Sequence, residues 1–487
     1  MSISNRKNGV FEGMVVTYAG QILGQVVSLV VSIILARLLM PDDYGVIAVV
    51  MIFLNIANVF ITDGFGNALI QKKEISKLDY STVQNFSLAF SFLMYIGLFF
   101  CSPLIAGFFN MPVLVNVIRV LSLQLPFNAI TSVQQAYISR NMLFHLQLIA
   151  SILAGICSAI CGITMAIRGF GVWALVGQYM VNAVLLVVIL QILIKQRFGY
   201  GFSVPIFKDL FSYGWKLLVT QLIDRTFNEI RGMAIGKMFS RADLAFYQKG
   251  QMYPNMIMSN IDTSMSKVIF PVISRNQEDY SEVRRLVSKT VRMSCFVVIP
   301  FLVLFYAISD KLVFILLTEK WMPCVLFIQI FCVYYAFTPI KSAKYQAIKA
   351  IGRTDVSLWC EILQKIFGAL ILVYTIFVLR TVEAIAYGNW AFAIITVIIT
   401  AIICKMYIGL SYRQQIKDIS HSFYMIFLIG LPLKLITFFE LGIYWELFLQ
   451  IIITFMIFIF ASRLFDFSEF NQLKETVLSF KNQLKKM

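Results

Sequence analysis

The chain has 487 residues, of which 59% are hydrophobic and only 14% are charged. A soluble domain is nearer a quarter charged, so this composition excludes a soluble protein and predicts a polytopic helical membrane protein. The net charge of +16 does not indicate a nucleic-acid partner, because the basic residues lie in short connections between apolar segments. Membrane orientation and an anionic ligand explain this distribution better.

Apolar segments long enough to cross a bilayer as helices follow one another along the whole chain. The segment 45–62 is short for a span, and 246–271 contains Pro254. The sequence predicts about fourteen segments, at 14–37, 45–62, 83–109, 113–137, 146–167, 171–194, 214–236, 246–271, 293–317, 324–348, 357–379, 383–404, 422–439 and 443–463.

The connections between these segments predict the orientation of the chain. With the N-terminus in the cytoplasm, the cytoplasmic connections carry most of the Lys and Arg residues that lie outside the segments. Both termini are therefore expected to be cytoplasmic. Every connection is short, so no large external domain is expected.

The order of the segments predicts an internal repeat. A shift of 200 residues lays Asp43 on Asp243 and Asn55 on Asn255. Six spans precede a basic linker and six follow it, so the two halves would insert with the same orientation around an axis along the membrane normal. The expected domains are an N-terminal lobe at 1–194, a basic cytoplasmic linker at 195–213, a C-terminal lobe at 214–404, two additional helices at 405–463 and a basic cytoplasmic tail at 464–487.

The segment 214–236 is unusually polar for a membrane span. Its polar residues recur three or four positions apart and therefore share one helical face. They are Gln221, Asp224, Asn228 and Arg231. Beside this face, Arg225 and Glu229 are four residues apart and can pair. An ionised group at the bilayer centre costs roughly 2.5–3.5 kcal/mol, so this face is expected to line a water-filled cavity or a protein interior; satisfied helix–helix contacts are the alternative.

Polar residues of three other predicted spans are further candidates for that interior. They are Gln21 and Gln25 in the first span, Asp262 and Lys267 in the eighth, and Lys341 and Lys344 in the tenth. The last pair is the weakest, because basic side chains also snorkel to the membrane surface.

No catalytic residue and no metal site is expected. The eight cysteines lie mostly within apolar segments, where a small buried hydrophobe is the usual role. The two histidines, His145 and His421, do not cluster with other ligand residues in the sequence.

Two motifs that follow the first two predicted spans resemble those of a known family. Residues 36–45 read ARLLMPDDYG, and the run DGFG at 63–66 is followed, after Asn67, by ALIQKK at 68–73. Both resemble motifs of the polysaccharide flippases, the lipopolysaccharide or exopolysaccharide repeat-unit translocases of the multidrug/oligosaccharidyl-lipid/polysaccharide exporter superfamily. Their physical role is structural: Pro41 cannot continue the preceding helix, and Asp42 or Asp43 can cap the next one.

The resemblance spans essentially the whole chain and implies a fold and a function. The expected fold is all-α, with two pseudo-symmetric six-helix lobes plus two C-terminal helices. The expected activity is transport, not catalysis: polyprenyl-pyrophosphate-linked oligosaccharide repeat units would cross from the cytoplasmic to the external leaflet of a bacterial inner membrane by alternating access. No cofactor is expected; a proton or sodium gradient would drive the transport. The polysaccharide polymerase and the glycosyltransferases of the same pathway are the expected partners, together with membrane lipids.

Within that function, cations would attract the pyrophosphate and amides would bind the sugars. The expected pyrophosphate partners are Arg225, Arg231 and Lys267, with Lys341 and Lys344 as weaker candidates. The expected sugar partners are Gln21, Gln25, Gln221 and Asn228. The residues expected to bind a coupling ion or to balance charge are Asp224, Glu229 and Asp262.

Three alternatives remain at the level of sequence. A cation-coupled multidrug exporter of the same superfamily resembles this chain less well, since such exporters have twelve helices and prefer cationic ligands. A membrane polysaccharide polymerase or ligase would carry a long external loop, which is not expected here. A purely structural anchor of an assembly complex would not need charged residues inside its spans.

Overall fold

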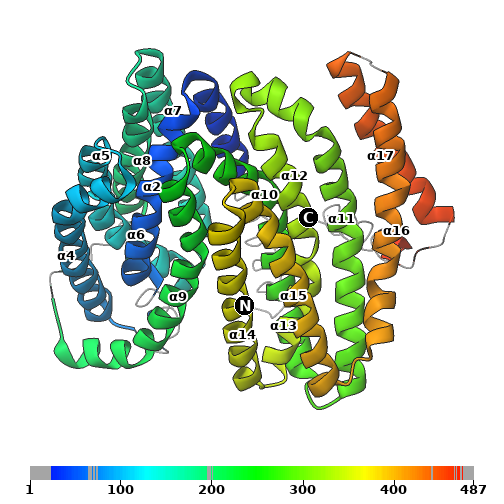
Figure 1. Ribbon diagram of the computed structural model, residues 1–487. Coiled ribbons are helices and arrows are strands. Elements are labelled where there is room, and N and C mark those ends of the chain that lie inside the picture. The colour runs from blue at the N-terminus through cyan, green and yellow to red at the C-terminus, as the bar shows by residue number, and fades with distance from the viewer. Residues whose placement is uncertain are drawn as a thin grey trace. The chain divides into compact units, whose positions relative to one another are not determined.

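The structure is a computed structural model that describes residues 24–63, 69, 72, 75–194, 199, 201–439, 442–464, 467, 469–471 and 474 (Figure 1). Within this part, only the backbone is described at 63, 212–214, 216–217 and 260–268. Every regular element described is a helix, which confirms the all-α class. The chain forms two compact units, Met1–Ala245 and Phe246–Met487.

The first unit begins, in its described part, with a helix over Gly24–Leu38. The elements that follow are α2 (Pro41–Asn58), the π-helix η1 (Val59–Asp63), α4 (Lys77–Phe109), α5 (Leu114–Leu121), α6 (Gln124–Arg140), α7 (Phe144–Ile167), α8 (Val172–Ile194) and α9 (Val204–Met238). Helix α9 bends: Figure 1 shows its first turns crossing the lower end of this unit before the helix turns upward.

The second unit takes up most of α10 (Arg241–Arg275) and all later helices. These are α11 (Tyr280–Leu317), η2 (Glu319–Trp321), α12 (Cys324–Ala336), α13 (Thr338–Ala350), α14 (Thr354–Tyr374), η3 (Thr375–Leu379), α15 (Val382–Ile408), α16 (Tyr412–Ile436), η4 (Thr437–Phe439) and α17 (Ile443–Leu464).

Eleven helices of the described part are long and apolar enough to cross a membrane. The expected count of fourteen is therefore not confirmed. Three expected segments fall outside the eleven: the helix Gly24–Leu38 is short, and α9 and α10, each of 35 residues, are too polar to count by composition.

The helices of the two units follow the same order, as a repeat predicts. Helices α4, α5–α6, α7 and α8 are matched in sequence by α11, α12–α13, α14 and α15. In both halves the fourth expected span is broken into two helices, and Pro126 or Pro339 follows the break. A proline lacks the backbone N–H that an interior helical position donates, so it is placed best near a helix start.

The starts of α2 and α10 also match. The carboxylate of Asp43 accepts from the backbone N–H of Met40 (3.1 Å), and that of Asp243 accepts from the N–H of Ser240 (3.0 Å). Asp43 thus provides the cap expected after Pro41. The lobe boundaries at 1–194 and 214–404 stay a prediction; in the structure α9 packs on α2 and α4 within the first unit.

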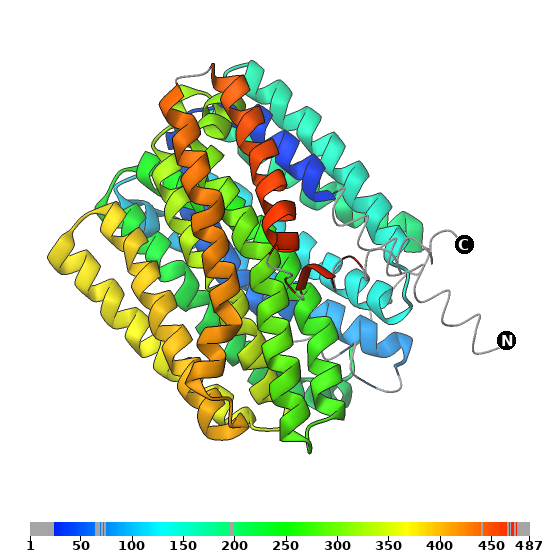
Figure 2. The ribbon, with the colours of Figure 1, turned by 90° about the vertical axis from the view of Figure 1, so that its right-hand side faces the viewer.

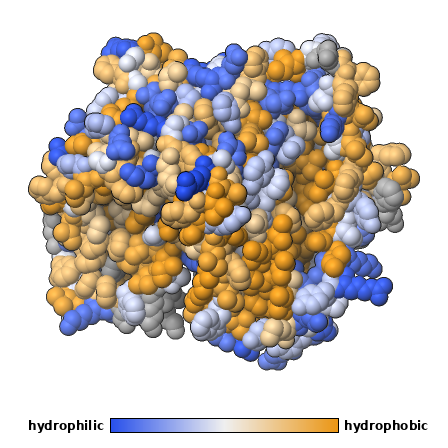
Figure 3. Space-filling view, in the orientation of Figure 1, coloured by the Kyte–Doolittle hydropathy of each residue, from blue (hydrophilic) through white to orange (hydrophobic). Residues whose placement is uncertain are grey.

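The outer faces of many helices are apolar. Figure 3 shows broad hydrophobic areas along the helices, with hydrophilic side chains gathered mostly toward the upper and lower ends of the view. On α14, for example, Trp359, Leu370 and Tyr374 are each more than half exposed. Such a surface suits contact with lipid, where every backbone polar group must be satisfied within a helix.

The last two helices pack on the rest of the second unit as a pair. Figure 2 shows α16 and α17 side by side in front of α11, and all three helices are in contact. Phe296 of α11, Met425 and Ile429 of α16, and Ala461 of α17 are buried together in one core cluster. The pair is therefore an integral part of this unit's packing.

Candidate functional site

A polar cavity lies within the first unit, between α2–η1 on one side and α9 on the other. Its volume is about 280 Å³. The wall from α2 and η1 consists of Asn55, Asn58, Val59 and Thr62. The wall from α9 consists of Gln221, Asp224, Arg225 and Asn228.

Helical periodicity explains why these residues meet. In both walls the lining residues stand at positions i, i+3, i+4 and i+7, which is one face of a helix. At Val59 the α-helix widens into the π-helix η1, and a single π turn is a feature that often accompanies functional sites. Thr62 in this turn donates its hydroxyl to the carbonyl of Asn58 (2.9 Å).

Glu229 of α9 links the two walls of the cavity through a hydrogen bond to α2 and also forms an ion pair within α9. Arg225 Nε lies 3.2 Å from Glu229 Oε1, one turn along α9. The same carboxylate oxygen accepts a hydrogen bond from Asn55 Nδ2 of α2 (3.0 Å). The Arg225 side chain is 43% exposed and that of Glu229 15%, so the guanidinium remains open to the cavity while its partner is largely covered.

Three further amides of this region are held by hydrogen bonds. Asn228 Nδ2 donates to Asp224 Oδ2 (3.3 Å), and Asn128 Nδ2 of α6 donates to Asn58 Oδ1 (3.0 Å). A carboxylate only accepts, so the partner amide must turn its NH₂ toward it and keep its oxygen for another group. Asn55 and Asn228 thus each keep an amide oxygen for a ligand.

The structure brings together five of the residues expected at the site. Gln221, Asp224, Arg225 and Asn228 line the cavity, and Glu229 is bonded to it. The last residue of the predicted stripe differs: Arg231 is buried outside the lining, with its guanidinium 5.5 Å from the centre of the Phe227 ring. Of the stripe on this helical face, Gln221, Asp224 and Asn228 therefore line the cavity, whereas Arg231 is packed inside the protein.

Other expected site residues lie elsewhere. Gln25 is half-buried on the helix Gly24–Leu38 and does not line the cavity. Gln21 and the side chains of Asp262 and Lys267 lie outside the described residues, as does the glycine turn at 64–66.

Lys341 and Lys344 belong to α13 of the second unit, where Lys341 is half-buried. Lys344 is 3% exposed, and its ammonium donates to Gln415 Oε1 of α16 (2.7 Å). One turn along α16, Asp418 is 1% exposed and lies 3.6 Å from Arg292 Nε. Arg292 also lies 3.8 Å from Glu469. Lys344 therefore belongs to a buried polar network, which we call the α13–α16 network.

Sequence reasoning did not nominate Asn55, Asn58, Thr62 or Asn128. The first three were detectable, because they recur at i, i+3 and i+7 in the segment 45–62, the same signal that marked 214–236. Asn128 carries no such signal; only the packing of α6 places it against Asn58.

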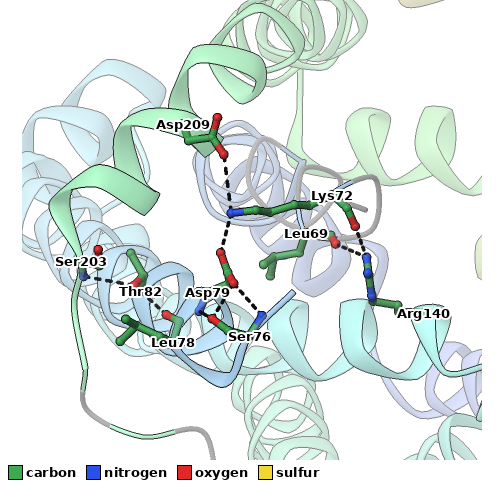
Figure 4. A network of polar contacts seen from close by, with 9 residues as sticks. All are labelled: Leu69, Lys72, Ser76, Leu78, Asp79, Thr82, Arg140, Ser203 and Asp209. Atoms are coloured by element: carbon green, nitrogen blue, oxygen red, sulfur yellow. Dashed lines mark hydrogen bonds and ion pairs between the residues drawn. The ribbon is translucent and has the colours of Figure 1, made fainter. Parts of the chain in front are cut away.

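A second polar network of the first unit holds the start of α9 (Figure 4). Lys72 Nζ lies between two carboxylates, 2.8 Å from Asp79 of α4 and 3.5 Å from Asp209 of α9. Asp79 also accepts from the hydroxyl and the N–H of Ser76, both at 2.7 Å. The hydrogen bond to Asp79 raises the pKa of Lys72 above its ordinary value. Arg140 binds the carbonyls of residues 69 and 72 from α6.

No cluster of three or more potential metal ligands occurs among the residues that the structure describes. The polar groups of the cavity are amides, one hydroxyl, one guanidinium and the carboxylate of Asp224, and the carboxylate of Glu229 lies beside them. This set of groups suits hydrogen bonding to a hydroxylated ligand, since amides and hydroxyls both donate and accept.

Residues 34–326 match the family described as "Polysaccharide biosynthesis protein". The chain is 23% identical over 358 residues to the teichuronic acid biosynthesis protein TuaB of Bacillus subtilis, a match that covers 70% of each chain. It is 21% identical over 405 residues to the lipopolysaccharide biosynthesis protein WzxC of Escherichia coli, covering 80% of each chain.

Among solved structures, the fold is similar to the lipid II flippase MurJ in an inward closed conformation, with a TM-score of 0.74 and 15% identity. That match covers 93% of this chain and 99% of the other. An inward-facing multidrug resistance transporter of the MATE family aligns with a TM-score of 0.61 and 15% identity, over 81% of this chain and 98% of the other. At these identities the two structures show the fold alone.

Proposed function

Because this multi-pass membrane chain belongs to the polysaccharide biosynthesis protein family, we propose that it is a flippase for polyprenyl-pyrophosphate-linked oligosaccharide repeat units. It would move them from the cytoplasmic to the external leaflet for the biosynthesis of a surface polysaccharide. The observation that carries this proposal is the polar cavity between α2–η1 and α9, set among apolar helices.

The cavity suits the polar part of such a substrate. A lipid-linked oligosaccharide has a hydroxyl-rich head that cannot cross hydrocarbon unaided, and a long apolar tail that can remain there. Amides and charged groups placed inside a membrane cost free energy unless they face water, a partner or a ligand. The amides of Asn55, Asn58 and Asn228 face a cavity of about 280 Å³, which supplies such a place. Alternating access would then expose this cavity to each side in turn.

We propose that the protein acts in a bacterial inner membrane. The distribution of Lys and Arg supports an orientation with both termini in the cytoplasm. WzxC is named for lipopolysaccharide biosynthesis, and MurJ for flipping lipid II. We propose that a proton or sodium gradient drives the transport and that the polymerase and glycosyltransferases of the same pathway act beside it. Arg231 and Lys267 stay candidates for the pyrophosphate.

The test is the distribution of the precursor between leaflets in cells that lack this protein but make the glycan. A membrane-impermeant glycosidase digests precursor only on the external face. We expect the deleted strain to accumulate protected precursor and the wild-type gene to restore digestion. A variant with both Asn55→Ala and Asn228→Ala should fail to restore it. The matched control is Asn116→Ala, which changes an exposed asparagine of α5 and should restore it fully.

Two results would contradict the proposal. If precursor reaches the external face normally in the deleted strain but stays unpolymerised, the protein acts after flipping, as a polymerase or ligase would. If the precursor is unaffected and the cells instead become sensitive to cationic drugs, the protein is a drug exporter.

A further inference from the structure

We infer that the cavity between α2–η1 and α9 receives an uncharged sugar ring of the substrate and excludes its pyrophosphate. This inference rests on the proposed flippase function and assigns one part of the substrate to one place. The head group would enter sugar first, with the pyrophosphate left outside the cavity on the side of the lipid tail.

The charges at the cavity are the first argument. Arg225 is the cation among the residues that line it, and its guanidinium is already paired with Glu229 at 3.2 Å. Asp224 also lines the cavity. One guanidinium is thus accompanied by two carboxylates, that of Asp224 in the lining and that of Glu229 beside it, and both would repel a pyrophosphate that approaches Arg225. Like charges in a site of reduced dielectric repel strongly, so the anion is disfavoured.

The direction of the hydrogen bonds is the second argument. Asn55 and Asn228 both turn their NH₂ groups toward carboxylates, which leaves their amide oxygens as acceptors. Those oxygens can accept from sugar hydroxyls. A pyrophosphate is ionised and offers almost only acceptors, so it can make no hydrogen bond to these two amide oxygens. A sugar hydroxyl donates and accepts, and it suits both these oxygens and the guanidinium of Arg225.

The size of the cavity is the third argument. Its volume of about 280 Å³ gives room for a sugar ring with its hydroxyls. We therefore assign one sugar of the repeat unit to the cavity, with the other sugars extending away from it.

Glu229 is the positioning residue in this scheme. Its Oε1 accepts from Arg225 and from Asn55 together, so one carboxylate both neutralises the cation and sets the direction of the amide. Glu229→Gln removes the negative charge and keeps the shape. The variant should therefore open the cavity to anions, a change of selectivity that a merely structural role would not produce.

The experiment measures binding by calorimetry to the purified full-length protein in lipid nanodiscs. One probe is the repeat-unit oligosaccharide released by mild acid from the host's own lipid-linked precursor; the other is inorganic pyrophosphate. We expect the wild type to bind the oligosaccharide and pyrophosphate not to compete. Asn228→Ala and Gln221→Ala should each weaken oligosaccharide binding roughly three- to tenfold, the effect of one lost hydrogen bond. In Glu229→Gln, pyrophosphate should compete.

The controls are matched in chemistry. Asn116→Ala changes an exposed asparagine of α5, and Glu383→Gln changes an exposed glutamate at the start of α15. Both should bind like the wild type, and thermal unfolding verifies that every variant is folded. Competition by pyrophosphate in the wild type would overturn the inference, and so would oligosaccharide binding that none of the cavity substitutions weakens.

Failure of this inference differs from failure of the proposed function. If the deleted strain flips its precursor normally, the function fails whatever the binding shows. If flipping requires the protein but pyrophosphate competes in the wild type, the function stands and only the assignment of the sugar to this cavity fails.

Discussion

The cavity of the first unit and the α13–α16 network of the second contain the same kinds of residue in opposite settings. At the cavity, Gln221, Asp224 and Asn228 are exposed, and Arg225 is 43% exposed despite its ion pair. In the network, Lys344 and Asp418 are 3% and 1% exposed and directly bonded to polar partners. Both sets are charged or amide side chains within helices that are otherwise apolar.

The difference shows how polar residues that bind a ligand can be distinguished from polar residues that stabilise the packing of the helices. A buried polar group needs a fixed protein partner, because leaving it unpaired costs its full desolvation. Lys344 has one in Gln415, and Asp418 has one in Gln414. The cavity groups are bonded to one another and still present atoms to an open volume. Substitutions should therefore damage stability in the network and function at the cavity.

The largest effect on stability is expected from Asp418→Ala. This carboxylate lies 3.6 Å from Arg292 Nε and accepts from Gln414 Nε2 at 2.9 Å. Breaking a fully buried pair costs about 3–5 kcal/mol, and we expect about 2–3 kcal/mol here because water reaches Arg292, which is 33% exposed. Thermal unfolding in detergent measures it. The matched control is Asp355→Ala, an exposed residue paired with Arg353, which should melt like the wild type. Equal melting temperatures for Asp418→Ala and Asp355→Ala would contradict the distinction between the cavity and the α13–α16 network.

An intermediate effect is expected from Lys72→Met in the network at the start of α9 (Figure 4). The methionine keeps the apolar stem and removes the ammonium, which leaves the buried carboxylate of Asp79 with only Ser76. We expect a loss of about 1–2 kcal/mol, the cost of a charge-assisted hydrogen bond to a buried group.

The same residue gives a pH prediction. The pKa of Lys72 is higher in the folded protein than in the unfolded chain, where a lysine has a pKa of about 10.4. Its charge therefore stabilises the folded state fully at any pH below about 10.4. The stabilisation is lost only when the pH rises through the higher pKa of the folded state. The difference in melting temperature between wild type and Lys72→Met should therefore be constant between about pH 6 and pH 9. A difference that shrinks toward pH 9 would mean that Lys72 loses its proton in that range.

Sequence periodicity was enough to predict much of the first unit's site. The spacing of Gln221, Asp224 and Asn228 predicted their shared face, and the spacing of Arg225 and Glu229 predicted their pair. The all-α class followed from composition, and the order of helices supported a repeat. These features depend on neighbours along one helix, which a sequence displays directly.

Long-range packing decided what sequence reasoning could not. Arg231 belongs to the same stripe as Asn228 but is buried outside the cavity lining. Lys344 donates to Gln415, a residue 71 positions away in the sequence. The break in the fourth expected span of each half was also missed, although Pro126 and Pro339 mark it. The segments 214–236 and 246–271 were expected to be spans despite their polar residues, but α9 and α10 are too polar to count among the eleven helices apolar enough to cross a membrane.

A smaller effect on stability, with a large effect on function, is expected from Arg225→Ala. The ion pair with Glu229 is a helical i, i+4 pair with one partner 43% exposed, so its loss should cost under about 1 kcal/mol. Flipping should nevertheless fall, because two carboxylates would then face the sugar without a cation. Melting temperature and the glycosidase assay together measure the split, with the exposed Arg413→Ala as control. Loss of stability as large as in Asp418→Ala would place Arg225 with the packing residues.

The smallest effect is expected from Asp209→Asn, and it tests whether exposure decides these outcomes. Asp209 and Asp79 both lie beside Lys72, yet Asp209 is 70% exposed and 3.5 Å away, whereas Asp79 is 5% exposed and 2.8 Å away. An exposed ion pair is screened by water, so its loss should cost only about 0.3 kcal/mol, within the error of most melting curves. Asp79→Asn is the matched comparison, because it removes the same charge beside the same lysine from a buried position. We expect Asp79→Asn to melt clearly lower than Asp209→Asn. If the two variants melt alike, the position of a carboxylate along the chain matters more than its burial, and the contrast between the cavity and the α13–α16 network would need another cause.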